Sequence, residues 1–131
     1  MIDVCLAYIF NDKGEVLLAQ RAREKHFGGL WEFAGGKVKD RESIAQAITR
    51  ELQEELCVDV TVKKIFAPYT YELEDGSTLQ FHPCLCEIVD GVLCATEHEA
   101  LKFVARDKLE FYDLAPPDYE AVTVLTRYLN D

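Results

Sequence analysis

The sequence predicts an α/β fold, in which a mixed, mostly antiparallel sheet is covered by helices on both faces. Short apolar runs bounded by turn residues indicate several strands. Residues 43–56 and 118–129 instead carry apolar side chains at the three- and four-residue spacing of amphipathic helices. The predicted order is two strands, a short strand, a helix, several strands and a closing helix, which is typical of a sheet packed between helices.

The first part of the chain predicts a hairpin followed by a basic loop. Residues 4–10 form an apolar run, residues 11–14 have the composition of a turn, and residues 15–20 are rich in Val and Leu, so we expect two paired strands. The loop that follows contains Arg21, Arg23, Lys25 and His26. Such a loop can neutralise phosphates, although cations on a loop serve solubility alone about as often.

A short strand and a double glycine precede the first helix. Trp31 and Phe33 alternate, so we expect one of them to point into the core and the other to face a ligand. Gly35 and Gly36 give the backbone the freedom that a close approach to a metal ion or a phosphate requires.

The first helix is predicted to begin at Ser43. Ser43 and Gln46 have the spacing of a capping box, in which each side chain satisfies a backbone N–H of the first turn. Apolar side chains recur along one flank of the helix, which would pack on the sheet. They belong to Ile44, Ala45, Ala47, Ile48, Leu52 and Leu56.

Beyond this helix the chain returns to strands. The predicted elements are strands at 59–66, 69–73, 78–89 and 101–105, a short helical turn at 107–114, and the helix at 118–129, which Pro116-Pro117 opens. Asp75-Gly76 predicts a hairpin between the second and third of these strands. Asp90-Gly91 predicts a turn, and Pro83 predicts a bulge or a sheet edge.

Three carboxylates share one turn of the first helix. Glu51, Glu54 and Glu55 lie three and four residues apart, so their side chains project from about one surface. Like charges at this spacing repel, so a cation that lies among the carboxylates would explain why the helix holds them together. Oxygen ligands of this kind suit Mg²⁺, and Arg50 can reach Glu54 or Glu42 to hold a carboxylate in one rotamer. The alternative is an ordinary solvated acidic face.

Composition limits the class of protein and of partner. The 131 residues suffice for one domain, and 49% hydrophobic with 29% charged residues is typical of a soluble globular protein. The net charge of -10, from 14 Lys and Arg against 24 Asp and Glu, argues against polymeric nucleic acid as a partner. A polyphosphate would be repelled too, so divalent cations are implied again. Membrane-span and signal-peptide features are lacking, so we expect a cytoplasmic protein. As a separate expectation, the protein is a monomer or a homodimer.

Five cysteines stand at positions 5, 57, 84, 86 and 94. Their number is odd and no two form a CxxC pair, which favours reduced thiols in a cytoplasmic protein. His82, Cys84 and Cys86 alternate and would share one strand face, but we favour small buried thiols over a zinc site because no fourth ligand has the expected spacing.

Residues 36–58 resemble the Nudix box, G-x5-E-x7-R-E-U-x-E-E-x-G-U, in which U is an aliphatic residue. The matching positions are Gly36, Glu42, Arg50, Glu51, Leu52, Glu54, Glu55 and Val58, and Cys57 stands where the motif has glycine. The likeness extends from the first strand to the last helix and includes RAREKHFGGLWEFAGGK ahead of the box. The chain therefore resembles the MutT branch of the Nudix hydrolases.

This resemblance implies an α/β/α sandwich and a Mg²⁺- or Mn²⁺-dependent enzyme that converts nucleoside triphosphates to monophosphates and pyrophosphate. The implied metal ligands are the Gly35 carbonyl, Glu51, Glu55 and Glu54, supported by Gly36, Glu42 and Arg50. Glu97 lies in the loop where the branch has a further carboxylate, so Glu54 or Glu97 would act as the base. The implied substrate contacts are Arg21, Arg23, His26, Phe33, Asp118 and Tyr119.

Three departures from the family pattern bear on stability and specificity. Cys57 replaces a helix-ending glycine, and left-handed backbone there would cost about 1 kcal/mol. Ala34 replaces the proline that usually precedes the double glycine. Tyr119 aligns with the Asn or Asp that reads oxidised guanine, and Asp118 is the neighbouring candidate.

The substrate therefore stays open at this point. One hypothesis is 8-oxo-dGTP or a related purine triphosphate, and a second is CTP or a modified cytosine nucleotide. A third hypothesis, a nucleotide-binding or regulatory domain without turnover, is disfavoured by the complete set of carboxylates, because a binding domain has no need of all of them.

Overall fold

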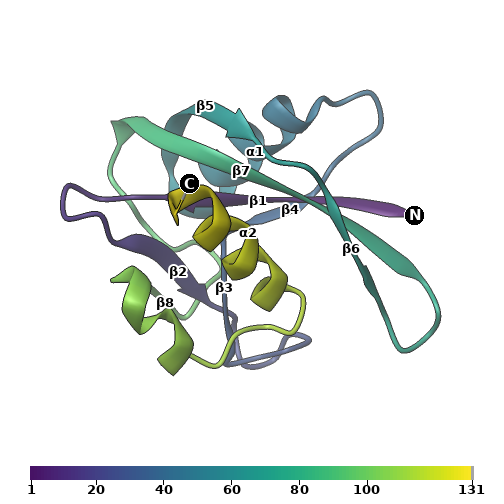
Figure 1. Ribbon diagram of the computed structural model, residues 1–131. Coiled ribbons are helices and arrows are strands. Elements are labelled where there is room, and N and C mark those ends of the chain that lie inside the picture. Colours follow the sequence, from purple (N-terminus) through teal and green to yellow (C-terminus); the bar gives the residue numbers. More distant parts are fainter. Residues whose placement is uncertain (131) are drawn as a thin grey trace.

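The computed structural model describes residues 1–130 and has the predicted mixed α/β architecture (Figure 1). Its strands are β1 (Ile2–Ile9), β2 (Val16–Gln20), β3 (Trp31–Glu32), β4 (Gly35–Lys37), β5 (Val58–Ile65), β6 (Tyr69–Glu72), β7 (Thr78–Gly91) and β8 (Ala100–Val104). Its helices are α1 (Ile44–Leu56), the 3-10 helix η1 (Arg106–Phe111) and α2 (Asp118–Asn130). Within residues 1–130, the helices are too short or too polar to span a membrane.

The strands form two sheets. The larger has the order β4-β1-β7-β5, with β6 also paired to β7, and the smaller has the order β3-β2-β8. β1 and β7 run parallel, whereas the other pairs are antiparallel. The prediction of a mixed, mostly antiparallel arrangement is therefore confirmed.

The helices α1 and α2 lie on opposite faces of β1. Cys5 and Ala7 belong to the core cluster that includes the buried side of α1, whereas Leu6 and Tyr8 belong to the cluster that includes α2. Successive side chains of a strand point to opposite faces, so the two helices cover the two sides of the larger sheet. Figure 1 shows α2, in yellow, in front of the strands.

The predicted hairpin of residues 4–10 and 15–20 is wrong. Asn11 does form a tight turn, because its side chain accepts two backbone N–H groups. After the isolated bridge between Phe10 and Val16, however, β1 and β2 diverge into different sheets. The physical reason is that a strand has two edges, and β4 and β7 occupy both edges of β1.

The strand β7 is longer than predicted. It continues through Asp90-Gly91, where a turn was expected, because its pairing with β5 extends to the register Val58 with Gly91. Pro83 lies where the antiparallel partner of β7 changes from β6 to β5. A residue without an N–H is tolerated at such a break in the ladder.

The helix α1 begins and ends as its sequence indicates. Ser43 Oγ accepts the N–H of Gln46, and the Gln46 side chain accepts the N–H of Ser43, so the predicted capping box is present. At the other end Cys57 has φ 65° and ψ 25°, which is the left-handed conformation that favours glycine. Between them, Ile48 and Leu52 are fully buried against the sheet, which fixes the direction of the acidic flank.

Candidate active site

A cavity of about 740 Å³ lies between β1, β4, α1 and the basic loop. The predicted site residues on its wall are Arg21, His26, Phe33, Gly35, Gly36, Glu51, Glu55, Glu97 and Asp118. Five predicted residues of the described chain lie off the wall, namely Arg23, Glu42, Arg50, Glu54 and Tyr119. The fold thus gathers most of the predicted residues around one space.

The double glycine lets β4 approach α1 and β1 closely. A Cβ on Gly36 would stand 2.6 Å from the Glu51 carboxylate, and a Cβ on Gly35 would overlap the backbone carbonyl of Cys5. The Gly35 N–H donates to Glu55 Oε1 at 3.3 Å. The backbone of β4 therefore meets two carboxylates of α1, an approach that side chains at these positions would block.

Arg50 orders the carboxylates from behind the cavity wall. Its Nε and Nη2 donate to the two carboxylate oxygens of Glu42 at 2.7 and 2.9 Å. Its Nη1 donates to Glu51 at 2.9 Å and to Glu54 at 3.3 Å, so both predicted partners of Arg50 are confirmed. The guanidinium, helped by the Lys39 N–H, lowers the pKa of Glu42 to about 2, and pairing with Glu42 raises the pKa of Arg50.

Glu55 is buried beside other carboxylates. Its exposed fraction is 9%, and burial followed by the charges of Glu51 and Glu32 raises its pKa to about 9. Among residues 1–130, no three His, Cys, Asp or Glu side chains converge closely enough to enclose a metal ion by themselves. The donors still fit Mg²⁺, which is usually bound by one or two carboxylates together with substrate phosphates and water. A divalent cation between Glu51 and Glu55 would relieve their repulsion.

The segment between β7 and β8 brings Glu97 to the cavity. Lys25 Nζ lies 3.5 Å from a Glu97 oxygen, and both side chains are about half exposed. Two further wall residues, Glu32 and His98, were not predicted. Glu32 accepts from Arg21 and pairs with His98 Nε2, each at 2.9 Å. Arg21 is therefore ion-paired on the wall, and Glu32 is held from two sides.

Asp118, the first residue of α2, reaches the cavity and its neighbour Tyr119 does not. Asp118 is 4% exposed and accepts the Phe33 N–H at 2.8 Å, and burial together with the Glu32 charge raises its pKa. Tyr119 is 53% exposed, and its hydroxyl accepts the Leu114 N–H. Adjacent helix residues point about 100° apart, so the two side chains cannot face the same space.

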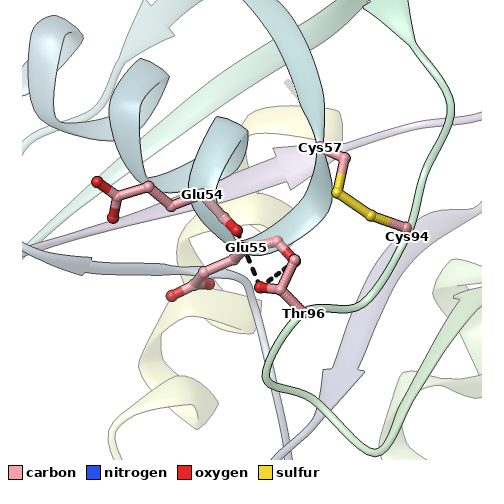
Figure 2. Close-up of a disulfide and its surroundings, with 5 residues drawn as sticks. All are labelled: Glu54, Glu55, Cys57, Cys94 and Thr96. Atoms are coloured by element: carbon pink, nitrogen blue, oxygen red, sulfur yellow. Dashed lines mark hydrogen bonds between the residues drawn. A yellow bond between two sulfur atoms is a disulfide. The ribbon is translucent and has the colours of Figure 1, made fainter.

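The expectation that the cysteines are all reduced is wrong. Cys57 and Cys94 form a disulfide, with Cα atoms 5.8 Å apart (Figure 2). Their sequence separation of 37 gave no motif to find, and the chain after β7 brings them together by returning to the end of α1. Cys5, Cys84 and Cys86 are free and buried, and burial raises their thiol pKa values to about 11, 12 and 12.

In this site a glycine-rich strand lies against a helix, and one arginine orders the carboxylates of that helix. Such an arrangement is suited to binding a divalent cation and phosphate groups. Residues 2–125 match the family model described as NUDIX domain, and the chain belongs to the Nudix family. Nudix hydrolases generally need divalent metal ions. The fold and the family together make this chain a Nudix hydrolase acting on acid anhydrides.

Named relatives span nearly the whole chain. A CTP pyrophosphohydrolase of Escherichia coli K12 is 42% identical over 90% of this chain and 86% of that protein. An 8-oxo-dGTP diphosphatase of the same strain is 32% identical over 96% of this chain and 97% of that protein. The solved structure of the E. coli ORF135 protein superposes with a TM-score of 0.84, at 40% identity, over 97% of this chain and 89% of that one.

Proposed function

We propose that the protein is a Mg²⁺-dependent nucleoside triphosphate pyrophosphohydrolase, which converts a nucleoside triphosphate and water to a monophosphate and pyrophosphate. The observation that carries this proposal is the meeting of Gly35-Gly36 with the carboxylates of Glu51 and Glu55 on a cavity wall. The relatives named CTP pyrophosphohydrolase and 8-oxo-dGTP diphosphatase support it.

The cation would be held by the Gly35 carbonyl, Glu51 and Glu55. Glu54 lies off the cavity wall, and its place in the Nudix box is the reason to assign it as a further ligand. When bound, Mg²⁺ polarises phosphoryl oxygens and lowers the pKa of the attacking water. Arg50 keeps Glu51 in one rotamer, because the guanidinium that binds Glu51 is itself fixed by Glu42.

The remaining chemistry is proton transfer and positioning. The water oxygen forms a bond to phosphorus as the bridging P–O bond breaks, and Glu54 or Glu97 takes up the proton that the water releases. Lys25 and His26 line the cavity, which supports assigning them to the triphosphate. Arg23 is exposed and lies off the wall, so we assign it no direct contact.

Phe33 and Asp118 line the part of the cavity that we assign to the base. Burial raises the pKa of Asp118 and so favours its protonated form. A carboxylic acid can donate a hydrogen bond to the edge of a base and accept one from it. Two bases are candidates. The 42% identity to a CTP pyrophosphohydrolase favours cytosine, and the 32% identity to an 8-oxo-dGTP diphosphatase favours oxidised guanine.

The setting that we propose is a single Nudix domain spanning residues 1–131, acting in the cytoplasm as a monomer or homodimer. Nucleoside triphosphates are the expected partners, and the net charge of -10 argues against polymeric nucleic acid.

The test is product analysis with Mg²⁺ against CTP, 5-methyl-CTP, 8-oxo-dGTP, dGTP and dATP. We expect monophosphate and pyrophosphate, a preference in kcat/KM for one triphosphate, and loss of turnover when EDTA removes the metal. Arg127→Lys, a change on the exposed outer side of α2, serves as a control that keeps the activity. Metal-dependent nucleotide binding without products would favour the regulatory alternative instead.

A further inference from the structure

A disulfide fastens the segment that carries Glu97 to the C-terminal end of α1. Cys57 is the residue at which α1 ends, and Cys94 lies three residues before Glu97. Both cysteines are exposed residues, so the disulfide lies at the surface of the protein, where exchange with dissolved thiols and disulfides takes place. The bond therefore joins the helix of the proposed metal ligands to the segment of a proposed base (Figure 2).

Hydrogen bonds beside the disulfide join the same two parts of the chain, residues 94–96 and the last turn of α1. The Cys94 N–H donates to the Leu56 carbonyl at 3.0 Å, and the Thr96 N–H donates to the Glu55 carbonyl at 3.1 Å. Thr96 Oγ1 donates to the Glu54 carbonyl at 2.8 Å, as Figure 2 shows. The attachment points are thus the carbonyls of Glu54, Glu55 and Leu56, and the first two of these residues carry site carboxylates.

The Glu97 side chain contributes little to its own placement. Its ion pair with Lys25 is 3.5 Å long, and the two side chains are 55% and 47% exposed. Exposed pairs of this kind contribute little to stability. On its C-terminal side, the His98 side chain is held by Glu32. The position of Glu97 therefore depends on the backbone attachments that flank it, at residues 94–96 on one side and at His98 and Glu99 on the other, where the Glu99 N–H donates to the Gln20 carbonyl.

The disulfide stands at a backbone position that favours glycine. Cys57 has φ 65°, which a side chain disfavours, and the Nudix box has glycine there. Within residues 1–130, the free thiols Cys5, Cys84 and Cys86 are buried. Buried thiols of raised pKa are poor nucleophiles. The accessible thiol chemistry of the described chain is thus concentrated in the pair that holds the Glu97 segment.

We propose that the Cys57–Cys94 disulfide is a redox-responsive staple, which holds the Glu97 segment against α1 and which a dithiol opens. In opening, a thiolate of the dithiol attacks one sulfur, the S–S bond breaks, and both cysteines end as protonated thiols. The dithiol gives up two electrons and becomes a cyclic disulfide. A small-molecule disulfide such as glutathione disulfide reverses the exchange and is reduced to two thiols.

The structural part of this proposal is tested without any substrate. One sample is treated with glutathione disulfide and one with dithiothreitol, and native alkylation followed by mass spectrometry counts the accessible thiols. We expect no alkylated cysteine in the oxidised sample, and alkylation of Cys57 and Cys94 in the reduced one. Hydrogen exchange at the Cys94 and Thr96 amides should become about tenfold faster on reduction, because local opening sets the exchange rate there.

The catalytic part rests on the proposed function. We expect kcat/KM for the preferred triphosphate to fall about tenfold on reduction and to recover on reoxidation, because misplacing a reacting group is costly. Cys57→Gly and Cys94→Ser should both have the lower kcat/KM of the reduced parent, and their kcat/KM should be the same in oxidising and reducing conditions. Cys86→Ala, which changes a buried thiol outside the pair, should keep the full response.

The outcomes separate the two proposals. Two accessible thiols after glutathione disulfide treatment, or equal exchange at residues 94–97 in both samples, would overturn the staple. Turnover that reduction leaves unchanged would overturn its catalytic part. A redox-dependent change in exchange with no hydrolysis of any triphosphate would support the staple and contradict the proposed function.

Discussion

Arg50 sets the geometry of several neighbours at once. The sequence predicted Glu54 or Glu42 as its partner, and the structure shows both together with Glu51 and the Lys37 carbonyl. This is possible because a planar guanidinium carries five N–H donors in a fixed arrangement. A point charge of the same sign could not hold Glu42 with two parallel bonds.

Arg50→Lys tests this role. We expect activity or apparent Mg²⁺ affinity to fall by about 10- to 100-fold, which is the usual effect of losing a residue that orients a metal ligand. Titration of kcat/KM with Mg²⁺ measures it, with Arg127→Lys as the control. Equal Mg²⁺ curves for the parent and Arg50→Lys would show that Glu51 needs no such support.

Glu55 should make stability fall as pH rises when metal is absent. Its folded pKa is about 9 against an ordinary value of 4.5, so the folded chain keeps a proton that the unfolded chain releases between these values. Where the folded state binds more protons, the free energy of unfolding decreases with pH, here by about 1 kcal/mol per pH unit. The contribution of Glu55 to the free energy of unfolding is fully present at pH values below its pKa in the unfolded chain. It is lost once the pH has risen to its pKa in the folded protein.

Urea unfolding in EDTA at several pH values between 5 and 8 checks this expectation. Glu55→Gln has no carboxyl group to ionise at this position. The free energy of unfolding of this variant should therefore increase relative to that of the parent as the pH increases. Two parallel stability profiles would mean that Glu55 ionises in the folded protein as it does in the unfolded chain.

At the scale of elements, the interactions at the two ends of α1 differ in how well the sequence predicts them. The start follows from Ser43 and Gln46, which lie three residues apart and satisfy each other's backbone N–H groups. The end lies where the sequence indicates, but Cys57 there is bonded to Cys94, which comes from a distant part of the chain. Local chemistry is readable in the sequence, whereas a pairing made by the tertiary fold is not.

Ser43→Ala should destabilise the protein by about 1 kcal/mol, because it removes the acceptor of the Gln46 N–H. The midpoint of urea unfolding measures the loss. Thr126→Ala, at an exposed position within α2, is the matched control and should change the midpoint little. A midpoint for Ser43→Ala equal to that of the control would exclude a stabilising cap.

Cys57→Gly should have opposite effects in the two redox states. Against the reduced parent it should be more stable by about 1 kcal/mol, because glycine relieves the left-handed backbone. Against the oxidised parent it should be less stable by about 2 to 4 kcal/mol, because it cannot close the covalent loop. Denaturant unfolding with and without dithiothreitol measures both, and a difference of one sign in both states would contradict this account.

At the scale of the whole molecule, the sequence predicted the strand and helix types and the mostly antiparallel pairing, and most of the candidate site residues that it indicated line one cavity. It did not predict that β1 and β2 separate, since an apolar strand does not disclose which neighbours occupy its edges. Glu32 and His98 were missed as wall residues because they meet only when the segment after β7 folds over β3. Alternation with Trp31 and Phe33 was the available signal that Glu32 faces another side.

The overall charge should keep the protein off polymeric nucleic acid. With a net charge of -10, the protein lacks the excess of cations that releases counterions from a phosphate backbone. Fluorescence anisotropy with labelled single-stranded DNA, read at low and moderate salt, should show no binding. A signal that weakens steeply with added salt would reveal a basic surface strong enough to overcome the net charge.

The parallel pair of β1 and β7 also has a consequence for synthesis on the ribosome. β1 is made first, yet one of its edges pairs with residues 79–86. This edge therefore stays unpaired until more than half of the chain has been translated. Loop closure over such a distance is slow, and an unpaired apolar edge is prone to aggregation in the meantime. A nascent chain stalled at residue 77 should therefore be cleaved readily by protease within β1, and a released full-length chain should be resistant there.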